Sequence, residues 1–195
     1  FLEPPEELVG KINVAPEMGD IMGMTLYYVD SEPCTSDRAA LKRARDLLVA
    51  AKPKWSSMGY SIKEQFAAGD MAASVYWNGD AMRTRMETPS VAYGYPKEGF
   101  VLWMDSVVVL KDAKNVENAK LFQNFVMDPE NAALLSNFAM YANAIDGSAP
   151  FMLDILATAP EVQIPAEHIG NGRFIEMCSP EVNELYTAIW TELMK

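Results

Sequence analysis

The stretch KINVAPEMGDIMGMTL (residues 11–26) joins a short apolar segment, Lys11 to Val14, to a segment with helical periodicity. Pro16 stands near the start of the second segment, where its fixed φ angle and missing N–H are tolerated. The apolar residues that follow recur at the spacing of one helix face, and they are Met18, Ile21, Met22 and Leu26. The stretch therefore predicts a strand followed by a helix.

Further strands are predicted outward from this unit. Met71 to Trp77 is typical of a buried strand, and Asn78-Gly79-Asp80 directly after it is typical of a turn. Residues 91–95 and 100–110 are rich in Val, Tyr, Trp and Phe, which favour strands.

The remaining predicted helices combine apolar periodicity with start and stop signals. Those signals are Ser36 and Pro53, Ser61 and Gly69, Asn115, Asp128-Pro129, and Ser179-Pro180. Because strands alternate with helices along the chain, we expect an α/β fold.

The charge balance limits the possible partners. The chain has 16 Lys plus Arg against 27 Asp plus Glu, a net charge of −11, and half of its residues are apolar. A negative field of this kind repels nucleic acid and favours a cationic ligand. No run approaches the roughly 20 apolar residues of a membrane span.

The sequence contains no recognisable metal or cofactor motif. His168 is the only histidine, and Cys34 and Cys178 are far apart in the sequence, so we expect no metal and no cofactor. The two cysteines permit one disulfide, but their spacing does not decide whether it forms.

Three places combine a carboxylate or a hydroxyl with an aromatic ring where predicted elements end. They are Trp77 with Asp80, Trp103 with Asp105, and Tyr141 after a helix. A carboxylate about 4 Å from a dehydrated ammonium returns on the order of 4 kcal/mol at an effective dielectric near 20. Aromatic faces add roughly 0.5 to 2 kcal/mol each. The pattern therefore suits an organic cation.

Each of these residues also has a structural explanation. Trp77 and Trp103 can be core residues, and Asn78-Gly79-Asp80 can be only a turn. Asp105 is flanked by apolar residues, so we expect it to be buried and to need a partner. Glu17 and Asp20 lie near a helix start, where the helix dipole favours carboxylates.

Several motifs in register resemble the periplasmic spermidine- and putrescine-binding proteins of ABC transporters. They are Trp77-Asn78-Gly79-Asp80, Pro96-Lys97-Glu98-Gly99, Trp103-Met104-Asp105-Ser106, Asp112-Ala113-Lys114-Asn115, Asp128-Pro129-Glu130 and Tyr141-Ala142-Asn143-Ala144. The likeness covers most of the chain from about residue 15 onward.

The resemblance implies a two-lobed periplasmic binding protein of type II, a monomer that closes on a polyamine in an interlobe cleft and delivers it to a membrane ABC permease. It implies no catalysis. By its motifs, the ligand contacts are Trp77, Asp80, Trp103, Asp105 and Tyr141, with Asp20 and, as a lesser candidate, Glu17.

The motifs leave the ligand open. Asp80 resembles the putrescine-binding branch, whereas residues 103–106 resemble the spermidine branch. Another small amine or an amino acid derivative is the alternative, and Arg83 or Arg85 would then face an anionic group. A hydrolase that uses two of these carboxylates is a distant alternative.

The resemblance also predicts how the chain divides. Residues 1–98 are expected to form most of the second lobe, residues 99–145 a returning part of the first lobe, and residues 146–195 a helical segment that packs on the second lobe. Family members carry roughly a lobe's worth of chain before the segment matching Lys11. We therefore expect either a truncated or proteolysed protein, or a companion fragment.

Overall fold

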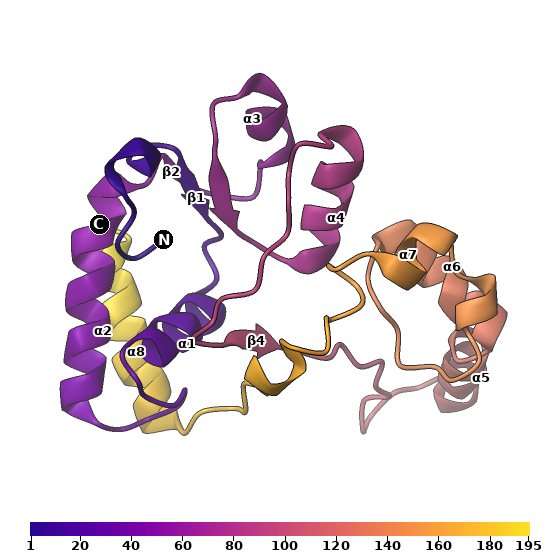
Figure 1. The fold of residues 1–195 in the computed structure, drawn as a ribbon. Coiled ribbons are helices and arrows are strands. Elements are labelled where there is room, and N and C mark those ends of the chain that lie inside the picture. Colours follow the sequence, from indigo (N-terminus) through magenta and orange to yellow (C-terminus); the bar gives the residue numbers. More distant parts are fainter. The chain divides into compact units, whose positions relative to one another are not determined.

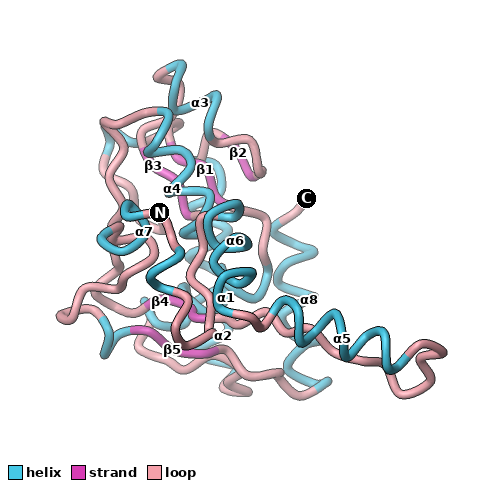
Figure 2. The backbone as a smooth tube through the Cα atoms, turned by 90° about the vertical axis from the view of Figure 1, so that its right-hand side faces the viewer, coloured by secondary structure: helices cyan, strands magenta, loops and turns pink.

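The computed structural model describes residues 1–195, which form two compact units. Unit 1 consists of residues 1–76, 84–103 and 166–195, and unit 2 of residues 77–83 and 104–165. Figures 1 and 2 show the elements of both units. The assignment of residues 1–98, 99–145 and 146–195 to lobes of a whole binding protein stays a prediction.

A three-stranded parallel sheet organises unit 1 (Figure 1). Its strands are β1 (Ile12–Val14), β2 (Ser57–Met58) and β3 (Ala73–Val75), in the order β2-β1-β3. Asn13, at the centre of β1, donates from Nδ2 to the Gly59 carbonyl and to Ser74 Oγ. Strands occur within both predicted segments, residues 11–14 and 71–77, but β3 is half-buried and not the buried strand that was predicted.

Four helices belong wholly to unit 1: α1 (Met18–Tyr28), α2 (Arg38–Ala51), α3 (Lys63–Ala68) and α8 (Pro180–Leu193). Ser179 caps α8 as predicted, with its hydroxyl accepting the Val182 N–H. Two predicted caps are wrong. Asp37, not Ser36, caps α2 by accepting the Ala39 N–H, and α3 begins after Ile62 without a side-chain cap, so Ser61 does not cap it.

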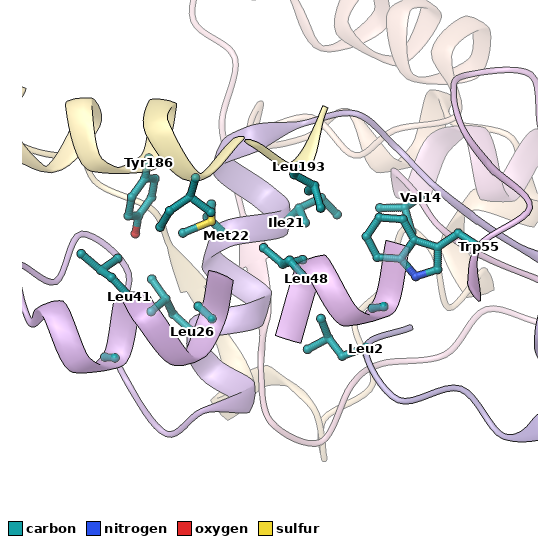
Figure 3. Close-up of a cluster of buried hydrophobic side chains, with 14 of the residues drawn as sticks. Leu2, Val14, Ile21, Met22, Leu26, Leu41, Leu48, Trp55, Tyr186 and Leu193 are labelled. Atoms are coloured by element: carbon teal, nitrogen blue, oxygen red, sulfur yellow. The ribbon is translucent and has the colours of Figure 1, made fainter. Parts of the chain in front are cut away.

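Apolar side chains from α1, α2 and α8 form the core of unit 1 (Figure 3). Ile21, Met22, Leu26 and Leu48 are completely buried there, and Tyr186 and Leu193 reach them from α8. The predicted stripes on these three helices are therefore the buried faces. Burying a side chain of this size contributes about 1.5 to 3 kcal/mol.

A second, two-stranded sheet in unit 1 pairs β4 (Phe100–Leu102) with β5 (Gly172–Phe174) in parallel (Figure 2). Two strand predictions need correction here. Residues 91–95 form no strand, because no other segment pairs with them; Tyr95 instead makes ring contacts with Tyr93, Phe100 and His168. The strand predicted over residues 100–110 ends at Leu102, because β5 offers no partner beyond Phe174.

Cys34 and Cys178 form a disulfide, with their Cα atoms 5.0 Å apart. It joins the loop before α2 to the segment before α8. Cys34 also donates its backbone N–H to the Tyr186 hydroxyl at 2.8 Å. The question left open by the sequence is therefore settled in favour of the bonded form.

Unit 2 is built mainly from α5 (Val116–Val126), α6 (Pro129–Ala139) and α7 (Asp154–Thr158), with the first turns of α4 (Asn78–Glu87). Asp128 caps α6 as predicted, and its carboxylate accepts the Glu130 N–H. The small core of this unit consists of Met82, Leu156, Ala159 and Val162.

The predicted turn at residues 78–80 is instead the first turn of α4. The Ala81 N–H already donates to the Trp77 carbonyl at 3.0 Å, so helical hydrogen bonding begins directly after β3. The helix formers that follow and the buried Met82 outweigh the local turn preference of Asn-Gly-Asp.

The remaining short elements are 3-10 turns at Glu6–Leu8, Lys52–Lys54, Ala149–Phe151 and Ile169–Asn171. No helix has both the length and the apolar character required to cross a membrane.

Candidate ligand-binding site

Two groups of carboxylates and aromatic rings occur, one in each unit. The group in unit 2 centres on Asp80, which lies in the first turn of α4 and is 25 % exposed. The helix dipole favours a negative charge at this position. Asp80 Oδ1 accepts a hydrogen bond from Arg83 Nη2 at 2.5 Å, one helical turn later.

Arg83 connects this carboxylate to the end of α6. Its Nη1 donates to the carbonyl of Ala139, the last residue of α6, at 2.5 Å. Carbonyls at helix C-termini lack intrahelical partners, so this bond satisfies one of them. The guanidinium carbon also lies 6.0 Å from the centre of the Tyr141 ring, within the range of a cation–π contact.

Tyr141 completes the group. Its hydroxyl exchanges hydrogen bonds with Asp80, accepting from the backbone N–H and donating to the carboxylate. Burial and, after it, the negative charge of Asp80 raise the pKa of Tyr141 to about 12, although the Arg83 charge acts in the opposite direction. The phenol therefore stays protonated and remains a hydrogen-bond donor to Asp80.

Asn78 and Gly79 shape the helix start beside this group. Asn78 Nδ2 donates to the Glu161 carbonyl at 2.7 Å, while its buried Oδ1 accepts no hydrogen bond. Gly79 packs so closely on the Tyr141 ring that an added Cβ would overlap it. Trp77 precedes these residues, partly buried, between β3 and α4.

The group in unit 1 lies at the carboxyl ends of the parallel strands. Glu17, Tyr60 and Tyr76 follow β1, β2 and β3 respectively. The Tyr60 hydroxyl donates to the Glu17 carboxylate, and this hydrogen bond, followed by burial, raises the pKa of Tyr60. The Tyr76 hydroxyl donates to the Tyr60 carbonyl at 2.8 Å, and the two rings meet edge to face, 6.4 Å apart.

The other predicted residues have different surroundings. Asp20 lies in the first turn of α1, one turn after Glu17. Trp103 directly follows β4 and is 45 % exposed. The expectation that Asp105 is buried is wrong: its side chain is exposed, because the strand ends at Leu102 and residues 103–108 lie at the surface.

The structure therefore brings Asp80 together with Tyr141, and it adds Arg83, which the sequence suggested only as a partner for an anionic ligand. The three-residue spacing of Asp80 and Arg83 was the available signal, because such pairs meet on a helix surface. Near Glu17 the structure adds Tyr60 and Tyr76, which belong to no motif and are distinguished only by their positions directly after strands.

The comparisons with known proteins agree with this architecture. The family described as bacterial extracellular solute-binding protein matches residues 13–164. The putrescine-binding periplasmic protein SpuD of Pseudomonas aeruginosa is 27 % identical, over 77 % of this chain and 42 % of its own length. The putrescine-binding periplasmic protein PotF of Escherichia coli is 25 % identical, over 99 % and 51 %.

Solved structures show the same fold. A putative spermidine/putrescine ABC transporter protein from Listeria monocytogenes superposes with a TM-score of 0.88 at 26 % identity, over 96 % of this chain and 58 % of its own. The PotD substrate-binding protein of Streptococcus pneumoniae gives 0.81 at 19 % identity, over 97 % and 59 %. The predicted α/β fold of solute-binding proteins is thus confirmed.

The chain spans about half the length of the two curated relatives. Since the family match covers most of the chain, the protein belongs to the bacterial extracellular solute-binding proteins.

Proposed function

We propose that this chain is part of a periplasmic polyamine-binding protein that captures a putrescine- or spermidine-like cation and delivers it to an ABC permease. We further propose that this binding protein is a monomer and that it has no catalytic activity, no cofactor and no nucleic-acid partner.

The arrangement around Asp80 is the observation that carries the proposal. A carboxylate at a helix N-terminus is held by the hydroxyl of Tyr141, whose ring packs on the same turn. A carboxylate and an aromatic face together suit an ammonium group and the methylene chain next to it. The buried Oδ1 of Asn78 is one further acceptor without a partner, and an ammonium has only donors to offer.

The relatives favour a polyamine over other organic cations. Their names state putrescine, spermidine, cadaverine or agmatine as what they bind. The acidic surface of this chain, with a net charge of −11, would attract such polycations.

We assign the ligand contacts to the residues that the motifs predict. In unit 2, Trp77, Asp80 and Tyr141 form the proposed cation and ring contacts. In unit 1, Glu17 and Asp20 supply carboxylates after β1, and Trp103 a ring. Asp105 is exposed, so it does not need a ligand cation as a partner. Its proposed ligand contact rests on the family motif alone.

Isothermal titration calorimetry of the chain with putrescine, spermidine, cadaverine and agmatine tests the proposal. We expect saturable binding of at least one of these amines. The matched controls are 1,4-butanediol and succinate, which keep the four-carbon length without the positive charges, and neither should bind. Binding of succinate in preference to every amine, or no binding of any amine, would contradict the proposal.

A further inference from the structure

Asp80 already has a cation beside it in the folded protein. Arg83 Nη2 lies 2.5 Å from Asp80 Oδ1. Arg83 is 33 % exposed and Asp80 25 %, so the pair is only partly accessible to solvent. This is the same kind of interaction that a ligand ammonium would make with the carboxylate.

Arg83 is fixed in this position from three directions. Besides Asp80, it contacts the Ala139 carbonyl through Nη1 and faces the Tyr141 ring. The planar fork of the guanidinium allows two different acceptors to be bound at once, which a lysine ammonium does with less geometric definition. These three contacts therefore hold the Arg83 side chain in place beside Asp80.

We infer that Arg83 is the specificity-determining residue at Asp80: it neutralises this carboxylate and so limits what a second ammonium group of the ligand can gain there. The inference rests on the proposed function and deepens it. Asp80 and Arg83 together carry no net charge, and a ligand ammonium that approaches this carboxylate also approaches the like charge of Arg83. Contacts with the alkyl chain and hydrogen bonds therefore contribute more to the binding free energy at this site than the second ammonium group of the ligand does.

The comparison of putrescine with 1-aminobutane measures this effect, because the two ligands share a four-carbon chain and differ by one ammonium group. In calorimetric titrations at fixed ionic strength, we expect Arg83→Gln to raise the ratio of putrescine affinity to 1-aminobutane affinity by about tenfold or more. Arg83→Lys keeps the positive charge and should leave the ratio close to that of the unaltered chain.

A structural role alone predicts a different pattern. If Arg83 only holds α4 against α6, Arg83→Gln weakens both ligands equally and Arg83→Lys behaves like Arg83→Gln, and either result overturns the inference. Arg43→Gln, on the exposed face of α2, removes the same charge elsewhere and should not change the ratio.

The two proposals fail in distinguishable ways. If the unaltered chain binds putrescine and Arg83→Gln leaves the ratio unchanged, the inference falls and the proposed function stands. If no variant binds any amine, both fall.

A measurement on the unaltered chain covers the case in which Arg83→Gln does not fold. Titration with putrescine should move the NMR resonance of the Arg83 Nε–H as the ammonium competes for Asp80. A resonance that stays in place at saturation overturns the inference.

Discussion

The ring of Tyr141 lies directly against the backbone of Gly79, so that a Cβ built on residue 79 would stand 2.5 Å from ring atom Cδ2. This contact fixes where the first turn of α4 meets the segment after α6.

We expect Gly79→Ala to destabilise the protein by about 1 to 3 kcal/mol, because the added methyl group must displace the ring. Thermal unfolding followed by circular dichroism measures the change. Gly19→Ala, at an open position within α1, is the matched control and should leave stability unchanged or slightly raised. Equal unfolding temperatures for Gly79→Ala and the unaltered chain would contradict the close contact between the Tyr141 ring and Gly79.

The protonation of Tyr141 should make stability depend on pH in the alkaline range. Its pKa is about 12 in the folded chain and near 10 when exposed. A raised folded pKa means that the stabilisation is complete below pH 10 and is lost as the pH rises toward 12. Denaturant unfolding between pH 8 and pH 11.5 should show this loss.

The variant Tyr141→Phe isolates the contribution of the Tyr141 hydroxyl from the other tyrosines with raised pKa values, such as Tyr60 and Tyr186. Its stability should fall less steeply above pH 10. An identical slope for the variant and the unaltered chain would contradict the buried, hydrogen-bonded phenol.

The Cys34–Cys178 disulfide closes a loop with a sequence separation of 144 residues. Because such a bond restricts the unfolded chain, we expect its reduction to cost about 2 to 4 kcal/mol. Unfolding should be compared with and without dithiothreitol. The double variant Cys34→Ser/Cys178→Ser should match the reduced chain, and it should not respond to the reductant. Unchanged stability after complete reduction would rule out a stabilising role.

The apolar faces of α5 and α6 should be accessible in this chain. No residue of α5 is buried, and Phe122, Phe125 and Phe138 are 57 %, 59 % and 86 % exposed. Exposed patches of this kind bind apolar dyes or partners. We expect 8-anilinonaphthalene-1-sulfonate to fluoresce with the folded chain, and Phe122→Ser/Phe125→Ser to reduce the signal with little loss of stability.

Ile21→Ala provides the contrast, because Ile21 is fully buried in unit 1 and its truncation should cost about 2 to 5 kcal/mol. If Phe122→Ser/Phe125→Ser lowered the free energy of unfolding as much as Ile21→Ala does, the exposure of the α5 and α6 faces would be contradicted.

Much of the fold was predictable from local patterns. The apolar stripes of α1, α2 and α8 are long and regular, and Asp128-Pro129 and Ser179-Pro180 are unambiguous starts, so these helices occur where predicted. Strand lengths were not predictable, because the end of β4 at Leu102 depends on where its partner β5 ends. The prediction of a turn at Asn78-Gly79-Asp80 is wrong, because tertiary contacts outweigh the local preference. These contacts are the packing of Tyr141, which is distant in the sequence, on Gly79 and the burial of Met82, which follows shortly after.

The candidate site was predictable in composition but not in geometry. The motifs single out Asp80 and Tyr141, and the fold brings them together. The pairing of Asp80 with Arg83 depends on the helix that replaces the predicted turn, so their three-residue spacing indicates a pair only once α4 is known to begin at Asn78. The exposure of Asp105 likewise follows from the early end of β4.

The affinity of Asp80→Asn for putrescine, measured by calorimetry beside the unaltered chain and Asp112→Asn, tests the recognition of an alkyl ammonium by this carboxylate most directly. Asp112 is an exposed carboxylate of the same unit, and its substitution removes the same charge. We expect Asp80→Asn to weaken binding by about 1.5 to 3 kcal/mol, because it removes the carboxylate and leaves the Arg83 charge uncompensated beside the ligand ammonium. Asp112→Asn should leave binding nearly unchanged. An Asp80→Asn variant that folds and binds putrescine as tightly as the unaltered chain would contradict the account.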